Sequence, residues 1–151
     1  TRNATLQVMK TVNQARGTPG GENDPDSSLI RRYHACTGEM DKDDTIKGFE
    51  QENFPMISCT MALGLGQNWK RVRRVIHMGR GDPSCICQMM GHCGRDGKSG
   101  LAILFMEKKR KYGINSIDAI KKANRETDDT RMDSLALTPI CLRIAFSVDN
   151  L

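Results

Sequence analysis

The sequence has few aromatic residues and no long apolar segment. Its 151 residues include one Trp, two Tyr and four Phe, so large rings supply little of any core. No apolar run approaches the roughly 18 residues needed to cross a bilayer, and we therefore expect no membrane-spanning helix and no membrane partner. The chain opens on a polar helical pattern, without the charged and then apolar segments of a signal peptide.

The cysteines are not arranged as a disulfide framework. They occupy positions 36, 59, 85, 87, 93 and 141, mostly within apolar runs, which is typical of reduced thiols inside the cell. Cys85, Cys87, His92 and Cys93 are soft ligands at short spacing. However, Cys85 and Cys87 fall in an expected helix, where residues i and i+2 point to different faces. We expect small buried thiols there, and neither zinc nor another metal.

Charge is unevenly distributed along the chain. The 23 Lys and Arg against 18 Asp and Glu give a net charge of +5. Basic residues gather at 70–74, 80–98 and 108–111. Acidic residues concentrate in 22–26, 39–52 and 126–133. A one-sided basic surface suits a polyanion such as nucleic acid or a nucleotide phosphate, and an ordinary solvated face is the alternative for any single cluster.

Apolar patterning predicts alternating strands and helices. Strands are expected at 29–35, 56–59, 72–79 and 100–106. Helices are expected over 3–15, over 37–53 with Thr37 as its cap, and from Asp82-Pro83 onward. Apolar strands joined by helices indicate an α/β fold, with helices on both faces of a parallel sheet. A tail of two or three helices follows, with helices near 116–125 and 139–150, and its abrupt end is expected to reflect truncation.

Two glycine-rich patterns invite a functional interpretation. Gly97-Lys98-Ser99 is similar to the end of a phosphate-binding P-loop, but the required upstream glycine is displaced by one residue to Gly91, and a helix precedes the pattern where a strand is needed. The segment from Gln88 to Gly97 is more informative. Its two glycines permit close backbone approach, and the Arg that follows them, Arg95, can present a guanidinium to a phosphate.

Several ordered motifs together resemble the RecQ-like group of superfamily-two DNA helicases. QMMGHCGRDG (88–97) resembles motif six, and TMALGLG (60–66) resembles motif five. The latter is followed by VR (72–73) and VIH (75–77) at the family spacing. Tyr33-His34-Ala35 and the strand at 100–105 also resemble family segments. The resemblance covers about residues 1–106 and implies that residues 1–107 form the second, C-terminal RecA-like lobe, with 108–151 as the tail.

The resemblance also implies roles for individual residues. Arg95 would be an arginine finger that stabilises charge on the γ-phosphate of ATP. Gln88, His92, Gly66 and Asn68 would bind the nucleotide. The residues that would contact single-stranded or partly duplex DNA are Thr60, Gly64, Lys70, Arg71 and Arg73. ATP and Mg²⁺ would be shared with a first RecA-like lobe, because this chain has no P-loop. The implied activity is ATP-dependent 3′–5′ unwinding in DNA repair and recombination, in the nucleus or cytoplasm.

Departures from the family pattern, above all His92 and the missing first lobe, keep a second hypothesis open. His92 stands where motif six has an Arg, and a His is shorter and mostly neutral at pH 7, which weakens a phosphate contact. Asn68 stands where motif five has an Asp; it can still hydrogen-bond a ribose hydroxyl. The alternative to a helicase lobe is a degenerate, non-catalytic module that binds nucleic acid or another protein. No ATPase is expected from this chain alone.

Overall fold

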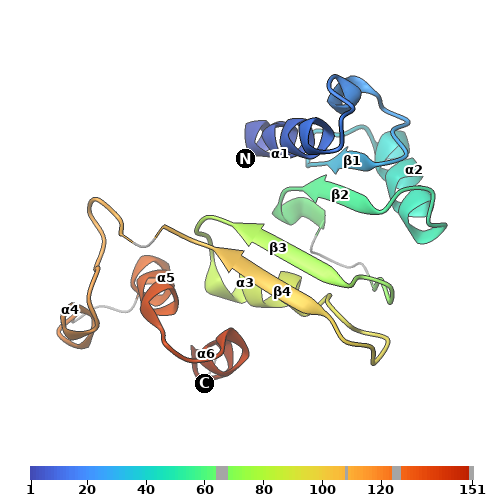
Figure 1. The fold of residues 1–151 in the computed structure, drawn as a ribbon. Helices are drawn as coiled ribbons and strands as arrows, with labels where there is room; N and C mark the ends of the chain where they lie inside the picture. Colours follow the sequence, from blue (N-terminus) through green and yellow to red (C-terminus); the bar gives the residue numbers. More distant parts are fainter. Residues whose placement is uncertain (64–67, 108, 124–126, 150–151) are drawn as a thin grey trace. The chain divides into compact units, whose positions relative to one another are not determined.

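The computed structural model describes residues 1–63, 68–107, 109–123 and 127–149. The chain divides into two compact units, Thr1–Gln67 (unit 1) and Asn68–Leu151 (unit 2). Each unit holds one pair of parallel strands together with its own helices (Figure 1).

Unit 1 is built around the parallel strands β1 (Ile30–Tyr33) and β2 (Met56–Cys59). Helix α1 (Arg2–Ala15) precedes them, and α2 (Glu39–Glu50) connects them. Two short 3₁₀ turns, η1 (Gly21–Asn23) and η2 (Met61–Leu63), complete the unit. The Ser58 hydroxyl donates to the Thr5 carbonyl at 2.9 Å, which fastens α1 to β2. The buried residues Met9, Ile30 and Phe54 form the core beneath this contact.

Unit 2 contains the second parallel pair, β3 (Arg74–Met78) and β4 (Leu101–Phe105). Helix α3 (Pro83–Met90) connects the two strands and packs against β3 (Figure 1). Three helices follow β4: α4 (Ile117–Lys121), α5 (Asp128–Leu137) and α6 (Leu142–Asp149). The core joins α3 to the last two of them through Ile86, Met132, Leu135, Ala145 and Phe146.

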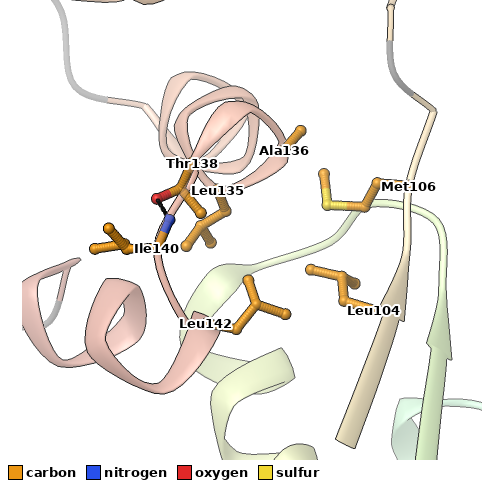
Figure 2. A pocket seen from close by; sticks show the side chains of 7 residues that line it. All are labelled: Leu104, Met106, Leu135, Ala136, Thr138, Ile140 and Leu142. Atoms are coloured by element: carbon orange, nitrogen blue, oxygen red, sulfur yellow. Dashed lines mark hydrogen bonds between the residues drawn. The ribbon is translucent and has the colours of Figure 1, made fainter.

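A hollow of about 220 Å³, lined mainly by apolar side chains, lies between β4, α5 and α6. Figure 2 shows Leu104 and Met106 directed from the end of β4 toward Leu135 and Leu142. The turn between α5 and α6 closes one side, where the Ile140 amide donates to the Thr138 hydroxyl at 3.4 Å. Leu104, Met106 and Leu142 of this lining are partly buried and also pack against the core of unit 2.

The α/β class, the four strands with parallel pairing and the helical tail are confirmed, and the architecture is compatible with a RecA-like fold. One detail of the helices differs. The N-cap of α2 is Gly38, because the Thr37 hydroxyl instead accepts from the His34 amide at 3.1 Å, so the predicted cap is wrong. The boundary between lobe and tail at 107/108 falls inside unit 2 and stays a prediction.

Candidate nucleotide and nucleic-acid site

The loop between α3 and β4, residues 91–100, is shaped by its helix start and its glycines. Asp82 caps α3 by accepting from the Ser84 amide at 2.9 Å, with Pro83 at the first helical position. After the helix, Gly94 (φ +73°) and Gly97 (φ +79°) adopt left-handed backbone, which favours glycine. A Cβ at Gly94 would come within 2.7 Å of the Lys98 carbonyl oxygen, so glycine is required there.

The loop brings together two of the predicted nucleotide-binding residues. The Arg95 side chain is exposed, and one of its terminal guanidinium nitrogens donates to Asn68 Oδ1 at 3.0 Å. Its Nε donates to the Gly91 carbonyl at 3.0 Å, which holds the side chain back across the loop. A guanidinium and a carboxamide thus lie side by side, 27 residues apart in sequence. Such a pair can offer donors to a phosphate and to a sugar hydroxyl.

An ion pair fixes the same loop to the start of β3. The two guanidinium nitrogens of Arg73 donate to the two carboxylate oxygens of Asp96, at 2.7 and 2.5 Å. The hydrogen bond from Arg73 lowers the pKa of Asp96 to about 2, and the Asp96 carboxylate raises the pKa of Arg73. The Gly94 amide also donates to the Val72 carbonyl at 2.9 Å. Arg73, predicted to contact DNA, is therefore engaged in holding the loop.

The other two predicted nucleotide residues of this region lie in different surroundings. Gln88 is exposed on the last turn of α3. His92 is buried, with 6% of its surface exposed, and its backbone amide donates to the Met89 carbonyl at 3.1 Å. The structure thus brings Arg95 and Asn68 together and places His92 in the interior.

The residues predicted to contact DNA are divided between the units. Thr60 belongs to unit 1, where its amide donates to the Tyr33 carbonyl at 3.1 Å, just beyond β2. Lys70 is exposed and Arg71 is partly buried, both in the turn before β3 of unit 2. Gly64 and Gly66 lie outside the described residues.

The two units differ in net charge. Residues 68–151 hold 16 Lys and Arg against nine Asp and Glu, a net charge of +7, whereas residues 1–67 hold seven against nine, a net charge of −2. The excess of basic residues therefore lies in unit 2.

A buried ionic cluster in unit 2 was missed by sequence reasoning. The Asp133 side chain is fully buried, and its two oxygens accept from Arg80 at 2.5 Å and Arg110 at 2.8 Å. The Ile114 amide donates to it at 2.8 Å. Burial acts to raise the pKa of Asp133, but these donors outweigh burial and lower it. The cluster links α5 to the loops after β3 and β4. The available signal was an acid at position 133 between the apolar Met132 and Leu135.

Neither a metal centre nor a membrane segment is found in the part of the chain that is described. Across residues 1–63, 68–107, 109–123 and 127–149, no three His, Cys, Asp or Glu side chains gather as a metal site. The helices within these ranges include none that is long and apolar enough to span a bilayer. All six cysteines are free thiols.

Unit 2 is thus an α/β unit whose loop 91–100 holds an exposed arginine, and known proteins with similar sequences are helicases. No protein-family model matches the chain. It is 28% identical over 107 residues to the ATP-dependent DNA helicase Q4 of Mus musculus. These aligned residues make up 70% of this chain and 9% of the relative. The human ATP-dependent DNA helicase Q4 is 28% identical over 102 residues, or 66% of this chain and 8% of the relative.

A third relative acts on a different nucleic acid by its name. The pre-mRNA-processing ATP-dependent RNA helicase prp5 of Emericella nidulans is 24% identical over 111 residues, or 67% of this chain and 9% of the relative. The chain therefore spans less than a tenth of the length of these relatives. The similarity supports a helicase-related region.

Proposed function

We propose that this chain forms the C-terminal RecA-like lobe of an ATP-dependent, RecQ-like 3′–5′ DNA helicase. The observation that carries the proposal is the hydrogen bond between Arg95 and Asn68, because two residues of different helicase-like motifs meet through the polar groups that a nucleotide needs. The similarity to helicases over about two thirds of the chain supports the same direction. We place the protein inside the cell, in the nucleus or cytoplasm.

The lobe's own residues divide the work. Arg95 offers positive charge to the transferring γ-phosphate, and Asn68 offers its amide to the ribose. Gln88 couples nucleotide state to closure of the lobes. Thr60, Lys70 and Arg71 bind nucleic-acid phosphates. ATP with Mg²⁺ supplies the free energy when it is held between this lobe and a first RecA-like lobe, which would bring the P-loop and the metal-binding acid.

The proposal is tested by ATP hydrolysis in the full-length gene product. We expect turnover to rise with single-stranded DNA, and Arg95→Ala to lower kcat by about 10³-fold or more, the range of known arginine fingers. Arg16→Ala, at an exposed arginine in unit 1, is the matched control and should leave kcat unchanged. Normal turnover by the folded Arg95→Ala protein would refute the finger, and stimulation by single-stranded RNA alone would move the assignment to RNA.

The 151-residue chain by itself should hydrolyse no ATP. Hydrolysis requires a phosphate cradle and Mg²⁺ ligands, and its sequence has no P-loop. Release of phosphate from ATP by the purified chain, with and without single-stranded DNA, is the measurement. Turnover that disappears in Arg95→Ala would contradict this expectation.

The burial of His92 favours a second candidate function, the degenerate non-catalytic module. Position 92 carries a phosphate-binding Arg in the family pattern, and a buried His at this position offers nucleotide less than that Arg would. The full-length protein distinguishes the two functions. Nucleic-acid binding without any ATP hydrolysis would favour the module over the helicase lobe.

A further inference from the structure

Unit 2 has a polar hollow of about 460 Å³ beside the loop that carries Arg95. The end of α3, the loop after it, the start of β4 and helix α6 form its walls. Lys98 from the loop and Arg143 from α6 are its two charged side chains. Neither Arg95 nor Asn68 lines it, so the hollow is separate from the candidate nucleotide site.

The positive charge of Lys98 and Arg143 is not balanced by an acidic side chain among the described residues that line the hollow. The described residues that line it include no acid, and both Lys98 and Arg143 are exposed. The nearest acid of the loop is Asp96, whose carboxylate receives both guanidinium nitrogens of Arg73. Lys98 also contributes to lowering the pKa of Asp96, after the larger effect of Arg73. With Asp96 held by Arg73, an anion in the hollow meets two cations and little opposing charge.

The rest of the lining selects a phosphate over a base. Ser99 brings a hydroxyl, and Gly97 brings backbone without a side chain. At Gly97 a Cβ would meet nothing within 4 Å, so the space above this backbone is open. None of the described lining residues is aromatic, which removes the stacking platform that proteins use for single-stranded bases. The volume lies within the range of about 300–1,000 Å³ that is usual for ligand pockets.

We propose that this hollow binds a backbone phosphate of single-stranded nucleic acid through Lys98, Ser99 and Arg143. The two cations neutralise the phosphodiester and release its condensed counterions, while the hydroxyl and the glycine backbone let it approach closely. The site reads no sequence, since it offers nothing to a base edge. It rests on the nucleic-acid contact in the proposed function, but not on ATP hydrolysis.

The test measures binding of a fluorescein-labelled oligothymidylate to the 151-residue chain by anisotropy. Lys98→Gln with Arg143→Gln should raise Kd about tenfold or more at 50 mM salt. The slope of log K against log salt should become shallower by about 0.7 for each single-strand phosphate that the variant no longer neutralises. Lys121→Gln with Lys122→Gln removes the same charge from exposed sites on and just beyond α4, and should leave this slope unchanged.

The outcomes distinguish a nucleic-acid phosphate from a nucleotide phosphate, and they distinguish failure of this site from failure of the proposed helicase function. Equal losses of affinity in the two double variants, or no binding by the wild-type chain at 50 mM salt, would overturn the site. Displacement of the oligonucleotide by ATP or pyrophosphate at matched phosphate concentration, in the wild type but not in the Lys98 and Arg143 variant, would assign the hollow to nucleotide and also overturn it. If Arg95→Ala abolishes ATPase while the hollow variant binds normally, the proposed function stands and this inference alone fails.

Discussion

At the scale of single residues, His92 occupies the position where motif six has an arginine. An arginine in a complete helicase would bring a fixed fork of donors to phosphate, but at 6% exposure the longer side chain and its charge must enter packed surroundings. We expect His92→Arg to destabilise the protein by about 1–3 kcal/mol through overpacking. The melting temperature of His92→Arg is compared with that of His92→Gln, whose side chain is closer in size to histidine. An unchanged melting temperature with higher ATPase in the full-length protein would show that position 92 reaches nucleotide.

The pair of Arg73 and Asp96 predicts a specific response to acid. The pKa of Asp96 lies at about 2, below its ordinary value of 3.8, so the folded state holds the carboxylate ionised more strongly than the unfolded chain does. Its contribution to stability is complete above the unfolded pKa and is lost as pH falls from about 4 through 2. Unfolding by urea between pH 6 and 2 should therefore show a steeper loss for the wild type than for Asp96→Asn.

A second Asp→Asn substitution serves as the control for the loss of one carboxylate. Asp44→Asn changes an exposed acid of α2 for which no ion pair is recorded within the described residues. It should lose stability with acid as the wild type does. The same acid response in all three proteins would mean that the ion pair adds nothing measurable, as for many exposed pairs.

At the scale of elements, the loop 91–100 depends on its two left-handed glycines to different degrees. Gly94 has φ +73° and a Cβ there would lie 2.7 Å from a backbone oxygen, whereas Gly97 has φ +79° and open space around it. We expect Gly97→Ala to cost about 1 kcal/mol from the backbone conformation alone. Gly94→Ala should cost more, because the backbone must also shift. Urea unfolding of the two variants measures the difference, and equal costs would contradict the close contact.

The elements also show which features a sequence can reveal. The strands were found because short apolar runs separated by glycines and polar residues leave few alternatives, as in 56–59 and 101–105. The tail was placed less well: the helix expected over 116–125 spans Ile117–Lys121, and the one expected over 139–150 begins at Leu142. Helix α5 lacked a defined prediction because the fully buried Asp133 interrupts its apolar stripe.

For the site, the sequence predicted residues but not their partners. Arg95 and Asn68 were both predicted at the nucleotide, and the structure joins them by a hydrogen bond that the sequence did not predict. Arg73 was predicted to contact DNA as a member of a basic cluster. The sequence of such a cluster does not show which of its cations pairs with an acid in the folded protein. Asp96, the partner of Arg73, lies 23 residues away, and only the folded loop brings the two together.

At the scale of the whole molecule, each unit has its own core. Phe54 in unit 1 and Met132 in unit 2 are both 1% exposed. Truncating either to Ala should cost about 2–5 kcal/mol, the range for large-to-small changes in a core. Hydrogen exchange followed by mass spectrometry should show protection lost mainly within the unit that carries the substitution. Equal loss of protection in both units from either change would contradict the division into two cores.

The core of unit 2 has a consequence for synthesis on the ribosome. Its members range from Ile86 in α3 to Phe146 in α6, so the core stays open until the last helix has emerged. Unit 1 takes its buried residues from the first 63 positions that the structure describes and is complete much earlier. At about 5–20 residues per second, the 79 residues from 68 to 146 take about 4–16 s to translate. During that interval the strongly basic half of the chain emerges unfolded, next to ribosomal RNA, while the acidic half can already be folded.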